Sequence, residues 1–433
     1  MRSSRAETAP PRRPQPHPPP TMPSSAQLPP ELVADVLDIF LLDNPSHVAR
    51  RRNLASFAAV SRRWFAVATP LLYRKLYLDS RTRSGILAAL EKNEALVPLV
   101  RELSLSGGGL DAVEYERLKH VLARCGGVER LGYHCFNEAT LQDLTRFVST
   151  AWPGLKYLRA DQSAHLFDLL SRLPALETLI ASYIEFPAPD AITPTPSPPG
   201  TRPTTPTSID DVAPVRRPTF RLKRLDSGSS PLPAHFHLLT SSSAHTLRSL
   251  DLPLSSLTSQ DLSAFASLER LTLTLAERYL PLAPDAVGAP AQPPQRAHGA
   301  RDDARLMRRV RRVLDSVGAA GSSGVSSPLR TLEVYEPAYA ATASISRAAV
   351  REGDLWAGVP SGVERLELAT VEGIEASDVV EAFGRGTVEG REGEKLCCVG
   401  VRELVLGRKV ASQEGAAEML SLTTRRGVRV LFE

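Results

Sequence analysis

Few residues in this chain have the type and spacing needed for catalysis or metal binding. His235 and His237 are one residue apart, but no third metal ligand follows at a useful spacing. Gly107 to Gly109 follow an apolar segment without the Lys-Ser/Thr of a phosphate-binding loop, and no G-x-S-x-G occurs. The cysteines form no C-x-x-C pair and are Cys125, Cys135, Cys397 and Cys398. We therefore expect no enzyme activity, no metal site and no cofactor.

Composition narrows the class of protein further. The chain has 433 residues, 42% of them hydrophobic, and a net charge of +4, which is too mild to indicate nucleic acid as the partner. So few thiols in so long a chain fit a reducing compartment. Because the first residues lack the apolar core of a signal peptide and no apolar run is long enough to span a membrane, we expect a cytoplasmic or nuclear protein without a membrane partner.

Without a candidate catalytic or metal site, the expected function is recognition of another macromolecule. A repeated sequence segment supports this expectation. Segments of the form aliphatic-x-x-Leu-x-aliphatic recur, usually after a helical stretch, and most intervals fit the unit of about 20–29 residues of leucine-rich repeats. They start at Val100, Val128, Leu155, Leu176, Leu222, Leu247, Leu268, Leu329, Val363 and Val401, with a last strand at Val428. We predict an α/β solenoid over residues 80–433, with parallel strands, outer helices and a long binding surface.

In each segment the aliphatic residues point inward, and the residues on either side of the second aliphatic residue point outward. The predicted outward positions are Glu102, Ser104, Arg130, Tyr157, Arg159, Arg224, Asp226, Asp251, Arg270, Thr272, Glu333, Arg365, Glu367 and Glu403. Arginine and tyrosine are favoured where a partner is anchored. The candidate target-binding residues are therefore Arg130, Tyr157, Arg159, Arg224, Arg270 and Arg365, although many outward residues in any repeat protein are simply solvated.

Proline-rich stretches interrupt this pattern. Residues 1–27 form a Pro/Arg-rich tail, and residues 187–218 and 281–303 are Pro-rich insertions; all three are predicted to be disordered. Residues 305–317 (RLMRRVRRVLDSV) place aliphatic side chains on one helical face and arginines on the other. We interpret this segment as an outer helix of a repeat rather than as a nuclear-localisation or nucleic-acid-binding patch.

Residues 28–78 form a separate block of three short predicted helices. In LPPELVADVLDIF and NLASFAAVSRRWFAVATPLLYRKLYL this block resembles the F-box, especially its fungal F-box-like form. The connection NPSHVARRRN (44–53) is longer and more basic than that of a compact F-box, and Pro70 is predicted to end the third helix. The resemblance implies binding to a Skp-type adaptor through Leu28, Pro29, Leu32, Val36, Ile39, Leu54, Phe57, Val60, Trp64, Leu71 and Tyr73.

An F-box followed by leucine-rich repeats implies the substrate-recognition subunit of a Skp–cullin–F-box ubiquitin ligase. In that reading the helices dock on the adaptor, and through it on a cullin, while the repeats bind a protein substrate. Two alternatives stay open. The block could be a helical cap that seals the repeats, or the chain could be a scaffold or regulatory protein acting outside any ligase. Within the F-box resemblance itself, Phe57 and Trp64 could be core residues instead of contact residues.

Overall fold

The computed structural model describes residues 29–43, 47–161, 166–181, 219–227, 240–253, 262–275, 300–319, 329–335, 355–371, 373–384 and 398–433. The chain divides into two compact units, Met1–Leu76 and Tyr77–Glu433, so the division falls two residues before the end of the predicted 28–78 block. The tail at 1–27 and the insertion at 187–218 lie outside the described residues, as do residues 281–299 of the second insertion.

The first unit is built from helices α1 (Pro30–Asp43), α2 (His47–Ala58) and α3 (Arg62–Arg74). Ser61 caps α3, where its side chain accepts a hydrogen bond from the backbone N–H of Trp64 at 3.4 Å. Two expectations are corrected. The basic segment predicted as a connection is largely helical from His47 onward, and Pro70 lies inside α3 rather than ending it. The helix continues because Leu71 and Leu72 pack against the core of the unit.

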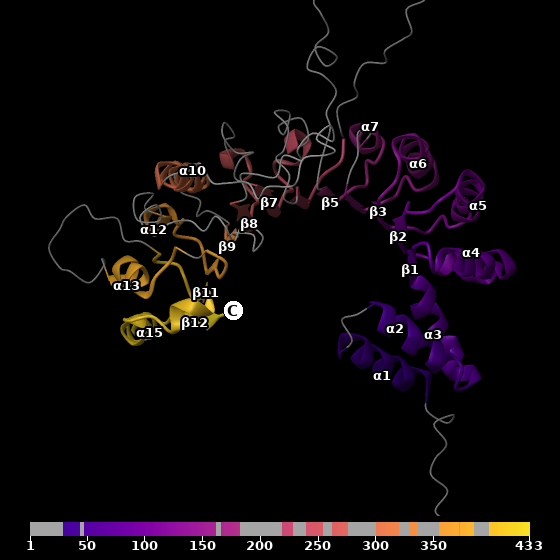
Figure 1. The fold of residues 1–433 in the computed structure, drawn as a ribbon, viewed down its shortest axis with the longest axis horizontal. Coiled ribbons are helices and arrows are strands. Elements are labelled where there is room, and N and C mark those ends of the chain that lie inside the picture. Colours follow the sequence, from indigo (N-terminus) through magenta and orange to yellow (C-terminus); the bar gives the residue numbers. More distant parts are fainter. Residues whose placement is uncertain are drawn as a thin grey trace, which may run out of the picture. The chain divides into compact units, whose positions relative to one another are not determined.

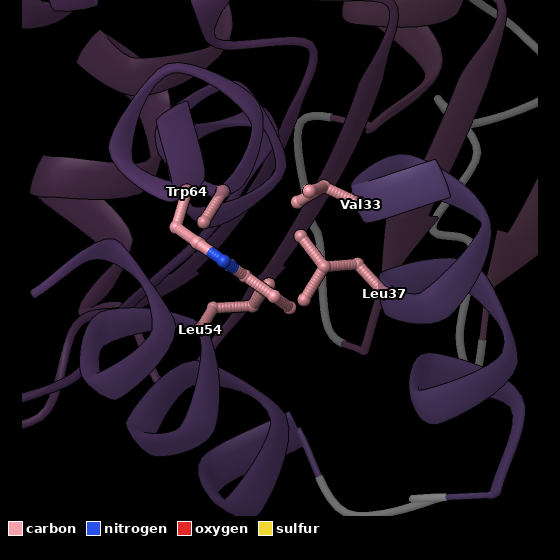
Figure 2. Packing of buried hydrophobic residues seen from close by; sticks show 5 residues of the cluster. Val33, Leu37, Leu54 and Trp64 are labelled. Atoms are coloured by element: carbon pink, nitrogen blue, oxygen red, sulfur yellow. The ribbon is translucent and has the colours of Figure 1, made fainter. Parts of the chain in front are cut away.

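A small apolar core holds these helices together (Figure 2). Val33 and Leu37 of α1 point toward Leu54 of α2 and Trp64 of α3. The Phe57 ring stacks on Trp64, with 5.2 Å between ring centroids and an angle of 18° between the rings. The unit therefore depends on a few aromatic and aliphatic contacts centred on one tryptophan.

In the described part of the chain, the strands form one twelve-stranded sheet whose spatial order follows the sequence from β1 to β12. The strands are β1 (Lys75–Leu78), β2 (Glu102–Ser106), β3 (Arg130–His134), β4 (Tyr157–Ala160), β5 (Thr178–Ala181), β6 (Arg224–Asp226), β7 (Ser249–Pro253), β8 (Arg270–Thr274), β9 (Thr331–Tyr335), β10 (Arg365–Leu368), β11 (Glu403–Leu406) and β12 (Arg429–Phe432). From β2 onward every neighbouring pair is parallel. The prediction of stacked parallel strands is confirmed.

One leucine per strand explains the uniform register. The Leu of each aliphatic-x-x-Leu segment aligns with the Leu of the next strand, and all of them are almost completely buried: Leu103, Leu131, Leu158, Leu179, Leu225, Leu250, Leu271, Leu332, Leu366 and Leu404. A slip of one residue would turn this whole leucine row to solvent, so the pattern itself fixes the register.

Charge alternates, with the exception of Lys223 and Arg248, at the position just before strands β2 to β11. There the backbone N–H of one repeat donates to the carbonyl of the same position in the preceding repeat, as Lys156 does to Glu129 at 2.9 Å. The residues are Arg101, Glu129, Lys156, Glu177, Lys223, Arg248, Glu269, Arg330, Glu364 and Arg402. Opposite signs therefore face each other at nearly every step, and Lys223 and Glu177, for example, form an ion pair at 2.9 Å. Each exposed pair contributes little alone, but like signs in adjacent repeats would oppose the stack.

Helices connect successive strands of the second unit, and α5, α6 and α7 lie on one side of the strands (Figure 1). The helical elements are α4 (Arg83–Lys92), η2 (Glu94–Leu99), α5 (Ala112–Ala123), α6 (Glu138–Ala151), α7 (Leu166–Leu170), η3 (Ser241–Ser243), η5 (Leu262–Ala264), α10 (Ala300–Ala319), α12 (Leu355–Gly358), α13 (Ala376–Gly384), α14 (Arg408–Ala411) and α15 (Ala416–Arg425). Of the helices that the structure describes, none combines the length and apolar character needed to cross a bilayer.

Two helical predictions need correction. Residues 300–303, which are predicted to belong to a disordered insertion, begin α10, because alanine and charged residues near that boundary also favour a helix. The stretch before β8, where a helical stretch is predicted as before most strands, forms the 3-10 turn η5 in its described part. The amphipathic prediction for 305–317 agrees with α10, in which Met307, Val310 and Leu314 are buried.

Candidate functional site

An apolar stripe runs along the solvent side of α1. Leu32, Val36 and Ile39 are 49%, 45% and 62% exposed. Their spacing of four and then three residues places them on one face of the helix, away from the buried pair Val33 and Leu37. Elsewhere on the same unit Val60 and Phe65 are also largely exposed. This set of side chains, Leu32, Val36 and Ile39, is called the α1 stripe below.

The other predicted adaptor-binding residues have different environments. Leu54 and Trp64 are only 5% and 7% exposed, so they support the unit from inside and offer no contact surface in the described structure. Phe57 and Leu71 are half-buried and pack against the same core, and Tyr73 is half-buried. Pro29 is exposed beside the start of α1, and Leu28 lies outside the described residues. In α1, the periodicity of the sequence does not separate contact residues from core residues, because this helix carries aliphatic side chains on two faces.

On the second unit, the face of the sheet opposite the leucine row carries most of the predicted target-binding residues. Five of the six predicted residues, Arg130, Tyr157, Arg224, Arg270 and Arg365, occupy one line of register across the strands. Arg159 lies two residues further along its strand. Arg429 of β12 continues the line. The arginine row means Arg130, Arg224, Arg270, Arg365 and Arg429.

A second line of register is acidic. Asp226, Asp251, Glu333 and Glu367, called the acidic row, lie two residues further along strands β6, β7, β9 and β10. The two rows pair with each other: Arg270 bonds to Glu333 at 2.9 Å, Arg365 to Glu367 at 3.1 Å, and Arg224 to Asp226 at 3.3 Å. Together the arginine row and the acidic row make up the part of the sheet that we call the strand face.

Two arginines have further partners outside the acidic row. The Arg130 guanidinium lies over the Tyr157 ring at 4.1 Å from its centroid, and its Nε is 3.5 Å from Glu102. Arg365 also donates to Glu403 at 2.6 Å. The strand face is therefore a network of ordered charges with an aromatic platform at one end.

Asp251 lies in the acidic row between Asp226 and Thr272. Its Oδ1 atom is buried and has no hydrogen-bond partner among the described residues. Burial raises the pKa of Asp251 to about 7; the carboxylates of Asp226 and Glu333 act in the same direction, whereas Arg224 and Arg270 oppose them. This carboxyl group therefore changes charge near neutral pH, on the same face as the candidate target-binding residues.

Replacing Asp251 with asparagine should stabilise the chain at high pH and have little effect at low pH. Because the folded-state pKa is raised from 3.8 to about 7, the stability associated with this group is present below pH about 4 and is lost as pH rises through about 7. At pH 8 we expect Asp251→Asn to raise the free energy of unfolding by roughly 1–3 kcal/mol. Urea unfolding at pH 4.5 and pH 8 measures the difference, and equal pH dependence in the variant and the parent would contradict it.

Arg83 is a buried charge that the sequence did not reveal. This α4 residue is 1% exposed. Its guanidinium donates to the Ser106 carbonyl at 2.8 Å and the Gly109 carbonyl at 3.4 Å, and pairs with Glu114 at 3.0 Å. The contacts connect α4 to β2 and α5 across the first repeats. No motif marks such an arginine, because it differs from solvated arginines only through partners distant in sequence.

A shallow depression of about 450 Å³ lies between η2 and the end of α5. Its lining includes Glu94, Arg101, Arg124 and Gly127. Arg124 pairs with Glu94 at 2.7 Å, and Arg101 donates to the Gly127 carbonyl at 3.2 Å. The polar groups of this depression satisfy one another, and its lining contains no histidine, cysteine or serine. Within the described residues, no group of three histidine, cysteine or acidic side chains is placed to hold a metal ion, and His235 and His237 lie outside them.

No family model matches this chain, and no curated protein matches it. Among solved structures, the chain is similar to the leucine-rich repeat-containing protein LegL7 from Legionella pneumophila, with a TM-score of 0.39 and 13% sequence identity. The similarity covers 83% of this chain and 90% of that chain. The repeat architecture described above rests on the register of the sheet and not on this likeness.

Proposed function

We propose that this chain is a non-catalytic receptor that connects two proteins. In this proposal the α1 stripe docks on the Skp-type adaptor of a cullin ubiquitin ligase, and the strand face binds the protein to be modified. The observation that carries the proposal is the α1 stripe. Three aliphatic side chains on one face of a helix remain about half exposed although the unit has its own core.

Exposed aliphatic side chains gathered on one helical face typically indicate a binding surface. Leu32, Val36 and Ile39 are also among the positions at which the sequence resembles the F-box. The buried residues Leu54 and Trp64 hold α2 and α3 beneath this surface. The proposal thus divides the predicted adaptor-binding residues into those that touch the adaptor and those that position them.

The chemistry of ubiquitin transfer would come from the attached enzymes. The strand face supports a recognition role, because it offers ordered guanidinium groups and an aromatic ring, which are common anchors in protein interfaces. In this proposal the chain itself supplies affinity and orientation for the target, and no cofactor.

Leu32→Asp and Ile39→Asp should each abolish co-purification of a Skp-type adaptor with the full chain. Burying an exposed leucine contributes about 1.5–3 kcal/mol, so a charge in its place should weaken binding more than tenfold. The matched control is Val113→Asp on α5, where the valine is 81% exposed but belongs to the repeats. The measurement is adaptor recovered per mole of purified chain, with hydrogen exchange of residues 30–74 to confirm folding.

The outcomes separate the ligase role from its alternative. Full adaptor recovery with both α1 variants would contradict docking through the α1 stripe. Recovery of adaptor without cullin would favour a scaffold that works outside a ligase. Affinity purification of the full chain, compared with a chain lacking residues 28–78, then sorts the partners: proteins lost with the deletion are ligase components, and those retained are targets.

A further inference from the structure

The spacing of the arginine row is regular over the second half of the sheet. Arg224, Arg270, Arg365 and Arg429 belong to β6, β8, β10 and β12, so each is two strands from the next. With neighbouring strands about 4.8 Å apart, the guanidinium groups recur about every 10 Å across the strands. A partner that contacts all of them must repeat its own acidic groups at nearly the same interval.

The arginines form the outer layer of the strand face. The side chains of Arg224, Arg270 and Arg365 are 51%, 54% and 38% exposed, whereas their partners Asp226, Glu333 and Glu367 are 15%, 18% and 20% exposed. The carboxylates therefore lie beneath and hold the guanidinium groups in place. In the ion pairs above, Arg224 and Arg270 each use only Nη2, and the guanidinium group has further N–H donors. Donors ordered in advance lose less entropy when a partner binds.

The acidic row limits which partner fits. It lies two residues along the strands from the arginine row, at a distance of about 6.6 Å. A uniformly acidic polymer would meet the carboxylates of Asp226 and Glu333 as soon as it covered both rows. The complementary partner has acidic side chains along one edge and basic side chains along the other.

An extended polyproline-II segment fits the spacing of the arginine row. It also fits three carboxylates of the acidic row, because Glu333 of β9 reaches over β8, where its Oε2 atom accepts hydrogen bonds from Arg270 and Thr272. It has three residues per turn and a rise of about 3.1 Å, so every third side chain returns to the same edge after about 9.3 Å. A β-strand repeats an edge after about 6.6 Å. In an α-helix, the side chain seven residues further along returns to the same edge after about 10.5 Å. The helix is about 10–12 Å wide, however, so the distance between its two edges is larger than the distance between the arginine row and the acidic row.

We propose that the strand face binds an extended, polyproline-II-like segment of a partner protein with acidic residues at every third position and basic residues one position later. The acidic side chains pair with Arg224, Arg270 and Arg365, and the basic side chains pair with Asp226, Glu333 and Glu367. This proposal rests on the proposed function, in which the strand face binds the target, and it defines the chemistry of that target.

Fluorescence anisotropy with synthetic peptides and the full chain tests this inference. The probe is a Glu-Lys-Pro repeat of about twelve residues. One comparison peptide has the same composition with the acidic, basic and proline residues in separate blocks. A second replaces proline with alanine and places glutamate at intervals of seven residues to favour a helix. We expect the Glu-Lys-Pro repeat to bind at least tenfold more tightly than either.

Variants of the chain connect the binding to the arginine row. Arg270→Gln and Arg224→Gln should each weaken binding of the Glu-Lys-Pro repeat roughly tenfold, because each removes a charged hydrogen-bond donor. Arg248→Gln is the matched control, because Arg248 is 65% exposed beside β7 but lies outside both rows; its affinity should change less than about twofold. Thermal unfolding of each variant confirms that the sheet is intact.

The inference is overturned if the block peptide or the helical peptide binds as tightly as the Glu-Lys-Pro repeat, or if Arg248→Gln weakens binding as much as Arg270→Gln. It is also overturned if no peptide binds at millimolar concentration. These measurements need no adaptor. A chain that captures the adaptor but not the peptide refutes only this inference, whereas one that binds the peptide but no adaptor refutes only the ligase role.

Discussion

Replacing Trp64 with alanine should unfold the helical unit while the repeats remain folded. Trp64 contributes the largest side chain to a core completed by Val33, Leu37 and Leu54, and it stacks on Phe57. Truncating a buried aromatic residue to alanine costs about 3–5 kcal/mol. A single small core of this size rarely provides more than about 3–5 kcal/mol in total. The loss should therefore remove the whole stability of residues 30–74 and, with it, the α1 stripe as an ordered surface.

Hydrogen exchange followed by mass spectrometry measures this outcome in each unit separately. Peptides from α1, α2 and α3 should lose protection in Trp64→Ala, and peptides from β2 to β8 should keep it. Trp64→Phe is the conservative control. It keeps an aromatic ring against Phe57 and removes the indole N–H, which is buried without a partner among the described residues. Retained protection of the three helices in Trp64→Ala would show that the core tolerates this cavity.

The sequence predicts the helical unit better than it predicts the faces of its helices. In α1 the aliphatic residues come in adjacent pairs, so a stripe through Leu32 and Val36 and one through Val33 and Leu37 are equally periodic. Only packing against Leu54 and Trp64 decides that Val33 and Leu37 are inside. Residues 47–53 are the opposite case, because polar composition indicated a connection although arginine and alanine also favour a helix.

For the repeats, the same reasoning predicted the position of nearly every strand. Leucine alternation identifies both the buried face and the register, because both follow from which side chains must avoid water. The outward positions were predicted for the same reason. The sequence does not predict that these positions form an arginine row and an acidic row. Which charged residues become neighbours depends on the register between strands, for example of Arg224 beside Ser249 and of Asp226 beside Asp251.

Glu114→Ala should destabilise the second unit by about 3–5 kcal/mol, although glutamate is an ordinary surface residue by type. The change leaves the Arg83 guanidinium buried with two backbone carbonyls and no counter-charge. The Arg83 Nε is already buried without a partner among the described residues, so the site has no spare acceptor to compensate. Chemical denaturation of the full chain, monitored on the repeats by hydrogen exchange, gives the change in stability.

A neighbouring ion pair provides the matched control. Arg117 and Glu91 join the same two helices, α5 and α4, at 2.6 Å, but their side chains are 39% and 36% exposed. Glu91→Ala should therefore cost less than about 1 kcal/mol. If the large effect of Glu114→Ala comes from a buried charge without a counter-ion, the double variant Arg83→Met, Glu114→Ala should recover part of the lost stability. Methionine fills the buried space without needing a counter-ion. A double variant less stable than Glu114→Ala would mean that Arg83 acts mainly through its bonds to the Ser106 and Gly109 carbonyls.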